Sequence, residues 1–421
     1  MCENHLPKHF KENSIDDWVK FFCVMYEKAN RDRLPAILWL EAIDEATKLA
    51  EEARKNRPSQ ILRRAVTLFG WLCGFVGKYT VQPPPHDTDP IGDLLKRRCD
   101  GDGCEESLGG WVWMKFPGRC PVCAGEKCLC PSYRKLAEDR HTFDVAATRE
   151  KLVSPDTNQS QKEFLQRQLN EHEDYLRLRK TWHTRVLEAR KDRDALKSFL
   201  GKPLDQQIDM FVDIFGGSQF DLDLLQITSK LLEEAGEVAR EIIALSELWE
   251  IKKRLKDGTL PEQDRQGLQK GLETLLAADQ HRLPPDFVEG LRAKSRENLV
   301  EAVHCFCEDA ANSLKGELAD VFSWLTAVLY KVGTSLCEYR EVQVWYQFSD
   351  IIMKHHQRDS ATLCCPECLE ATCDRLCLWM NICRTILEDK KKEYKRDTAE
   401  QWEAEEISPV GGISTGCGAG C

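Results

Sequence analysis

Two short acidic patterns hold the residues of this chain that are best suited to chemistry. One is Glu233-Glu234-Ala235-Gly236-Glu237 and the other is Glu317-Leu318-Ala319-Asp320. Carboxylates three or four positions apart share one face of a helix, so each pattern predicts an acidic helix face. Two such helices packed together would bring five carboxylates to one place: Glu233, Glu234, Glu237, Glu317 and Asp320. Like charges this close require a cation or retained protons, and Mg²⁺ or Mn²⁺ suits an all-oxygen ligand set.

The residues around the acids predict the helices that position them. Apolar residues recur at steps of three and four in both segments, LLEEAGEVAREII and GELADVFSWLTAVLY. An alternative interpretation is that both acidic faces are simply solvated, as is common on charge-rich helices. The strongly apolar flanks favour burial beside a core instead.

The order of the two patterns, KLLEEAGEVA followed by ELADVFSWL, resembles the EExxE and ExxD signature of the MazG-like all-α NTP pyrophosphohydrolases. The resemblance covers about residues 200–335. It implies a mainly α, helical-bundle fold and Mg²⁺-dependent hydrolysis of a nucleoside triphosphate to NMP or dNMP plus pyrophosphate. The carboxylates are the expected metal ligands, and Glu233 or Glu234 is the expected catalytic group that orients or deprotonates the attacking water.

Substrate contacts are expected along the same helices. Lys230, Arg240 and Lys331 are candidates for phosphate binding, and Trp324 is a candidate for stacking on a base. A solvated helix end is the favoured interpretation for Lys331, and a core position is favoured for Trp324.

A weaker copy of the acidic module lies near the N-terminus. A shift of 192 residues places Glu41 and Glu45 on the first pattern, and a shift of 253 places Arg64 and Thr67 where the second has its acids. We therefore expect a degenerate helical module without a metal centre, in which Arg64 pairs with the glutamates. Its helices are expected to pack on the acidic ones as an intrachain pseudo-dimer, with a homo-oligomer as the alternative. One buried apolar face is expected at Ile37, Leu40, Ile43, Ala46 and Ala50.

Two cysteine clusters share the spacing CPxC-x4-C. The first contains Cys120, Cys123 and Cys128, and the second contains Cys365, Cys368 and Cys373. Such a turn presents thiolates to one tetrahedral ion, which predicts structural Zn²⁺ in a knuckle or ribbon. The expected remaining ligands are Cys99 or Cys104 for the first cluster; for the second they are Cys377 or Cys364, with His355 or His356 as a further choice. Reduced structural thiols and an iron–sulfur cluster are the alternatives.

The patterns together predict a mainly α chain of several parts. The degenerate module covers residues 1–81, the first cysteine cluster 94–135, a solvated helical spacer 136–200 and the catalytic module 201–345. The second cysteine cluster with a helix follows at 346–400, and a disordered tail at 401–421. Relative to the first copy, the catalytic module carries roughly 61 additional residues near 250–300, which are expected to form surface loops around one short helix.

Composition limits the classes of function. The 421 residues carry a net charge of −11, so there is no general basic field for nucleic acid. Neither a signal peptide nor a membrane span is evident, which predicts a cytoplasmic protein whose 20 cysteines serve metals or remain free thiols. The rival functional hypothesis is a non-enzymatic interaction protein whose cysteine modules contact protein or nucleic acid. It is supported by basic and aromatic residues around the first cluster, namely Lys96, Arg97, Arg98, Lys115, Arg119, Lys127, Trp111 and Trp113.

Overall fold

The computed structural model describes residues 12–30, 33–81, 91, 106–130, 145–155, 157–216, 222–279, 296–340 and 348–356. Over these residues the chain forms twelve helices and no strand, which confirms the mainly α class. None of the described helices is long and apolar enough to cross a membrane. The expected second cysteine cluster and the C-terminal tail lie outside the described residues.

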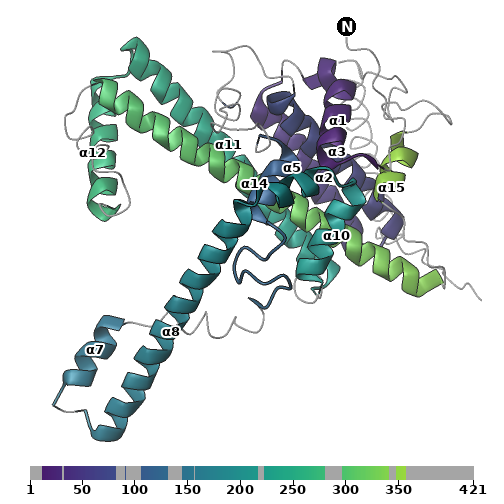
Figure 1. The fold of residues 1–421 in the computed structure, drawn as a ribbon. Coiled ribbons are helices and arrows are strands. Elements are labelled where there is room, and N and C mark those ends of the chain that lie inside the picture. The colour runs from purple at the N-terminus through teal and green to yellow at the C-terminus, as the bar shows by residue number, and fades with distance from the viewer. Residues whose placement is uncertain are drawn as a thin grey trace, which may run out of the picture.

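Two long helices form the centre of the fold, α11 (Leu224–Asp257) and α14 (Arg296–Arg340), and they pack along one another (Figure 1). A capping box starts α11: the Asp223 side chain accepts from the Gln226 amide at 2.8 Å, and the Gln226 side chain accepts from the Asp223 amide at 3.1 Å. Gly258 ends the helix in the left-handed region at φ 71°. The predicted helices around both acidic patterns are therefore present, and they pack against each other.

The additional residues near 250–300 are more helical than expected. They extend α11 to Asp257, start α14 at Arg296 and add α12 (Glu262–Asp279), so that an arm projects from the body (Figure 1). The extension has its own apolar contacts, since Leu255 and Leu299 are buried. An insertion that continues two paired helices leaves the acidic segments free to pack.

The N-terminal helices are α1 (Ile15–Asn30), α2 (Pro35–Arg54) and α3 (Pro58–Thr80). As expected, they pack on the acidic helices: α2 contacts α11 and α3 contacts α14. The Trp39 indole donates to the Ala235 carbonyl at 2.8 Å, and the rings of Phe69 and Phe322 lie 6.1 Å apart. One continuous core therefore joins the two copies within the chain.

The buried face of α2 matches the prediction only in part: Ala46 is buried and Ile43 packs against the core. Ile37 and Leu40 are exposed at 47% and 60%, whereas Leu38, Trp39 and Ala42 are buried. Both α3 and α11 pack against α2. The buried residues of α2 are therefore those that contact either of these two helices. At Ile37 and Leu40, counting apolar residues at helical spacing selected the neighbouring face instead.

The expected ion pair of the N-terminal copy is present. Arg64 on α3 donates to Glu45 on α2, with Nη1–Oε2 at 3.1 Å, and Lys48 reaches the same carboxylate at 2.9 Å. Glu45 is only 7% exposed, so these cations compensate a buried charge. No group of metal-ligating side chains is found around it among the described residues.

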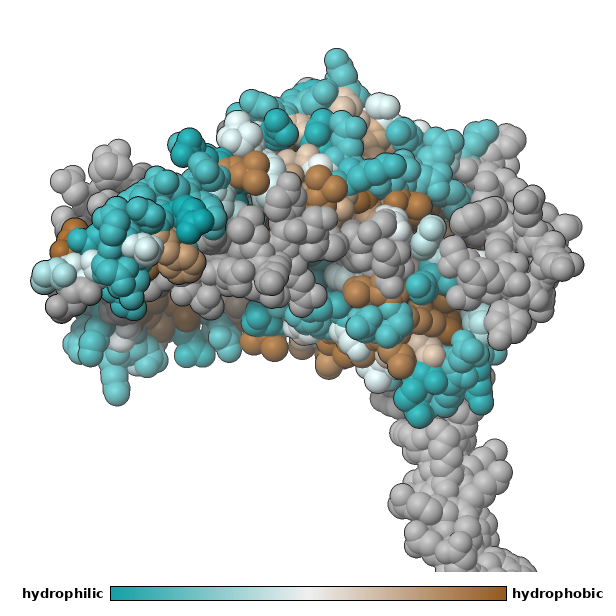
Figure 2. All heavy atoms as spheres, turned by 90° about the horizontal axis from the view of Figure 1, so that it is seen from below, coloured by the Kyte–Doolittle hydropathy of each residue, from teal (hydrophilic) through white to brown (hydrophobic). Residues whose placement is uncertain are grey.

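The remaining helices surround this centre. They are α5 (Leu108–Lys115), α7 (Val145–Val153), α8 (Gln159–Arg190), α9 (Arg193–Leu200), α10 (Leu204–Phe215) and α15 (Phe348–His356). The expected spacer helix is α8, which projects from the body with α7 packed on it (Figure 1). Along α8, Leu169 and Val186 are buried but Leu176 is 49% exposed. Figure 2 shows a mostly polar surface with smaller apolar patches.

Breaking the Arg64–Glu45 pair should destabilise the protein. We expect Arg64→Met to cost about 1–2 kcal/mol, because a buried carboxylate loses one of its two cationic partners, and to lower Tm by roughly 2–6 °C. Thermal unfolding followed by circular dichroism measures this. Arg63→Met, at the adjacent exposed position, is the matched control. Equal melting temperatures for the two variants would show that the pair does not stabilise the fold.

Candidate functional site

Three of the five predicted carboxylates meet at the α11–α14 interface. Glu234, Glu317 and Asp320 each offer an oxygen, and these oxygens all lie within 4.8 Å of one another. Buried neighbours hold the acids in place: Leu231 and Ala235 on α11, and Leu318 and Val321 on α14. All three acids are half-buried, so they stand at the edge of the core and not on a freely solvated face. Such a group of oxygens could hold a divalent cation.

A lysine that sequence reasoning did not place here completes the cluster. Lys115, the last residue of α5, forms an ion pair with Asp320 and donates to the Gly316 carbonyl at 3.3 Å. The side chains of Lys115 and Asp320 are 27% and 18% exposed, so the pair is partly screened from water. Lys115 and Asp320 are 205 residues apart in sequence, and no local signal connects them.

The position of α5 depends on contacts at its N-terminus. Ser107 caps the helix by accepting from the Gly110 amide at 3.0 Å, and Asp16 of α1 accepts from the Gly109 amide at 2.9 Å. A Cβ at Gly109 would lie 2.8 Å from Leu200 and 2.9 Å from Asp16, so only glycine permits this approach. These contacts fix the helix whose last side chain reaches the carboxylates.

The carboxylates hold protons more tightly than free acids. Burial raises the pKa of Glu234 to about 7, and the charges of Asp320, Glu317 and Glu237 add to this, against a smaller lowering by Lys115. Burial also raises the pKa of Glu317 and of Asp320, although Lys115 opposes both shifts. A single ammonium therefore leaves the cluster with excess negative charge.

The other two predicted acids, Glu233 and Glu237, lie outside the close group of three carboxylates. Glu233 is 54% exposed and pairs with Lys230, while Glu237 is 34% exposed and lies 3.7 Å from Arg240. Both predicted phosphate contacts, Lys230 and Arg240, are therefore engaged with acids of their own helix. Glu237 is near enough to raise the pKa of the three clustered acids, but it is not part of the close group.

Lys331 and Trp324 do not join the cluster. Lys331 lies eleven residues beyond Asp320 on the same helix, which is about 16 Å along its axis. Trp324 is half-buried and packs against the hydrophobic core, which agrees with the favoured interpretation.

A second candidate metal site is formed by cysteines. The Sγ atoms of Cys120, Cys123, Cys128 and Cys130 all lie within 4.8 Å of one another, an arrangement that could bind a metal such as zinc. Backbone hydrogen bonds shape the loop: the Cys120 amide donates to the Gly125 carbonyl and the Ala124 amide to the Cys120 carbonyl, both at 2.9 Å. Ala124 has a positive φ of 54°, which closes the turn.

Several contacts stabilise this cysteine loop (residues 120–130) against the body. The Leu129 amide donates to the Cys123 sulfur at 3.3 Å, and the Cys128 amide donates to the Ile214 carbonyl of α10 at 2.6 Å. Hydrogen bonds from the neighbouring thiols lower the pKa of Cys123, which favours a thiolate there. Thiolates are the form of cysteine that binds zinc.

The fourth thiol of this group, Cys130, is not one of the predicted ligands. The predicted remaining ligands of this cluster, Cys99 or Cys104, lie outside the described residues. The thiols of Cys128 and Cys130 lie close to those of the CPxC turn, so all four candidate ligands come from eleven consecutive residues. The expected ligands of the second cluster, Cys365, Cys368, Cys373 and Cys377, also lie outside the described residues.

His356, a further choice for that second cluster, is buried at the end of α15. Its ring lies 5.2 Å from Phe22. Burial lowers its pKa to about 4, so the ring is neutral and packs as part of the core.

Comparison with known proteins identifies no relative: no protein-family model, curated protein or solved structure matches the chain.

The cysteine loop should hold one metal ion that depends on Cys130. We expect Cys130→Ser to remove one metal equivalent per chain from protein purified without added metal, because only three thiolates remain. Elemental analysis by mass spectrometry measures the content. Cys305→Ser, at a half-buried cysteine on α14, is the control. Unchanged metal in Cys130→Ser would contradict the four-thiolate site.

Proposed function

We propose that the α11–α14 site hydrolyses a nucleoside triphosphate to the monophosphate and pyrophosphate with a divalent cation, Mg²⁺ or Mn²⁺. The observation that carries the proposal is the convergence of Glu234, Glu317 and Asp320 from two helices within 4.8 Å. It is supported by the resemblance of both acidic patterns to the MazG-like pyrophosphohydrolases. Since phosphoryl transfer depends on positioning and charge neutralisation, a small set of carboxylates is sufficient.

The acids have different surroundings, and we assign them different roles. Asp320 and Glu317 lie on one helix and would hold the cation, with Glu237 at the margin of the same site. Glu234 has a pKa of about 7, which suits a general base at neutral pH. It would accept the proton of the attacking water as the new bond to phosphorus forms and the anhydride bond to pyrophosphate breaks. A bound cation would offset the phosphate charge and make its water more acidic.

Lys115 would change partner during this cycle. Its ammonium occupies an oxygen of Asp320, so cation binding would displace it. The backbone of Lys115 is fixed at the end of α5, where the Phe116 amide donates to the Val112 carbonyl at 2.8 Å. The displaced ammonium would therefore stay close and could bind a phosphate oxygen.

The proposed reaction gives a direct prediction. Purified protein with Mg²⁺ or Mn²⁺ should release pyrophosphate, not orthophosphate, from at least one nucleotide in a panel of NTPs and dNTPs. Glu234→Gln and Asp320→Asn should each lower kcat at least about 100-fold, since the first removes the proposed general base and the second a proposed ligand of the cation. Enzyme-coupled pyrophosphate detection measures this.

Matched variants separate a catalytic loss from a structural one. Glu247→Gln, at an exposed position on α11, and the double variant Glu41→Ala with Glu45→Ala in the N-terminal copy should both retain hydrolysis. Full activity in Glu234→Gln and Asp320→Asn would refute the assignment. Loss of activity in a folded Glu41/Glu45 variant would show that the N-terminal copy is also catalytic.

Cation affinity should depend on pH. A proton on Glu234 competes with the cation, so affinity should rise as pH increases from 6 to 7 and level off above the pKa of about 7. Calorimetric titration with Mn²⁺ at pH 6, 7 and 8 measures the change. The Glu234→Gln variant should bind Mn²⁺ weakly, and its affinity should change less with pH. If the affinity of the unaltered protein changed equally little with pH, protonation of Glu234 would not control cation binding.

A further inference from the structure

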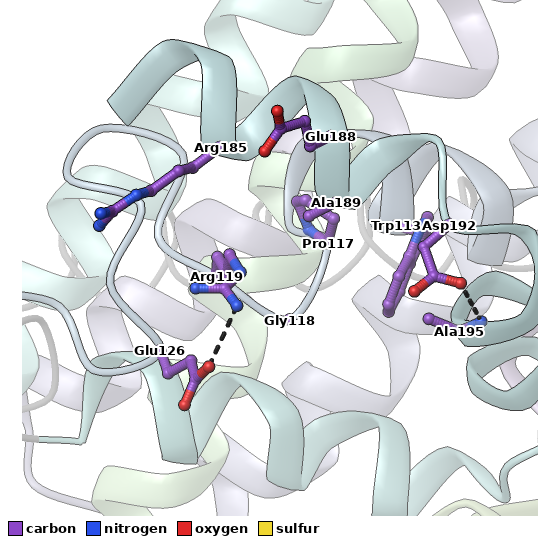
Figure 3. A pocket seen from close by; sticks show the side chains of 10 residues that line it. All are labelled: Trp113, Pro117, Gly118, Arg119, Glu126, Arg185, Glu188, Ala189, Asp192 and Ala195. Carbon is purple, nitrogen blue, oxygen red and sulfur yellow. Dashed lines mark hydrogen bonds and ion pairs between the residues drawn. The ribbon is translucent and has the colours of Figure 1, made fainter. Parts of the chain in front are cut away.

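A cavity of about 650 Å³ lies between the cysteine loop and the junction of α8 with α9 (Figure 3). Its polar lining comes from Trp113, Arg119, Glu126, Arg185, Glu188 and Asp192. None of the clustered carboxylates lines it, and it is separate from the site proposed above. Its volume is within the usual range of ligand-binding pockets.

An aromatic ring forms part of the wall of this cavity. Trp113 is only 7% exposed, and its indole N–H has no hydrogen-bond partner. The ring packs on Phe199 with centroids 5.4 Å apart, which fixes its orientation. The indole nitrogen has no accessible surface, so what Trp113 presents to the cavity is part of its ring, which offers an apolar contact to a planar base.

Charged groups are arranged unequally along the cavity. In Figure 3, Arg119 and Arg185 lie toward one end, while Trp113 and Asp192 lie toward the other. Arg119 belongs to the loop side and pairs with Glu126 at 3.1 Å, and Arg185 extends from α8. The arginines suit a phosphate. The carboxylates of Glu188 and Asp192, near the Trp113 ring, suit the amino donors at the edge of a base.

The lining of the cavity has two arginines and three carboxylates, whereas the helix next to it is basic at this end. Residues 177–193, at the α8–α9 end, include seven basic and two acidic side chains, whereas residues 159–176 include two basic and four acidic ones. Arg179, Lys180, Arg185 and Lys191 are exposed. A ligand with several phosphates in a row would therefore be favoured over a single nucleotide.

We propose that this cavity binds an unpaired base of a single-stranded nucleic acid, whose flanking phosphates lie on Arg119, Arg185 and the basic end of α8. The base must be unpaired because a duplex cannot insert a base into a cavity. The cysteine loop provides one wall, so its metal would maintain the binding surface. Lys115 and Trp111, two other residues of this region, do not contribute, since Lys115 pairs with Asp320 and Trp111 is buried beneath Lys315.

Fluorescence anisotropy with a labelled single strand of about 12 nucleotides tests the proposal on the full chain. Arg119→Ala with Arg185→Ala, which removes both arginines of the lining, should weaken binding at least about tenfold and reduce the salt slope by about 1.4, or ~0.7 for each lost phosphate contact. Lys162→Ala with Arg167→Ala, on the acidic half of α8, is the matched control and should change affinity less than about twofold. Trp113→Phe should weaken binding without changing the salt slope.

Four results would overturn the proposal. They are the absence of binding at about 50 mM salt, equal weakening by the two double variants, equal competition by polyglutamate, and equal competition by a free nucleoside monophosphate. The third would indicate general electrostatic attraction, and the fourth a small-molecule pocket. Because the assay contains no nucleoside triphosphate and reports no hydrolysis, its outcome is independent of the proposed pyrophosphohydrolase activity.

Discussion

Negative charge at the interface of α11 and α14 is the constraint on which the rest of this structure depends. Burial and mutual repulsion both oppose ionisation of Glu234, Glu317 and Asp320, and the pKa of all three is raised. The N-terminal copy and the second copy neutralise buried carboxylate charge in different ways. In the N-terminal copy Arg64 and Lys48 neutralise the single buried Glu45. In the second copy Lys115 neutralises only part of the charge, and we propose that a divalent cation neutralises the rest.

A short stretch of chain connects the cysteine loop to the lysine that contacts the carboxylate cluster. Lys115 ends α5, and Phe116 packs on Phe211 and Phe215 of α10 with centroids 5.2 and 5.8 Å apart. The loop that follows is tied to the same helix through the Cys128 amide and the Ile214 carbonyl. Phe211 in turn lies 5.7 Å from Phe322, two residues beyond Asp320. A metal in the loop would thus stabilise the elements that hold Lys115 and the acids.

Sequence reasoning succeeded where the information is local. Acids at steps of three and four lie on shared helix faces because helix geometry requires it, and Arg64 occupies the place of an acid because the repeat keeps its register. The mainly α class followed from the same periodicity. The ion pair of Lys115 with Asp320 could not be predicted, because 205 residues separate the two and only the packing of α5 joins them. The fourth thiolate was missed, although the Cys128-x-Cys130 spacing next to the CPxC turn was a usable signal. The buried face of α2 was misassigned in part because two neighbours cover that helix.

The central claim is that the carboxylate cluster binds a divalent cation in exchange for Lys115, with Glu317 and Asp320 as its ligands and Glu234 beside it. The most direct measurement is an anomalous difference map from crystals soaked in Mn²⁺, recorded at the manganese absorption edge. The account predicts a peak between Glu234, Glu317 and Asp320, with the Lys115 ammonium displaced from Asp320. A map without a peak at this position, in which Lys115 still contacts Asp320, would contradict it.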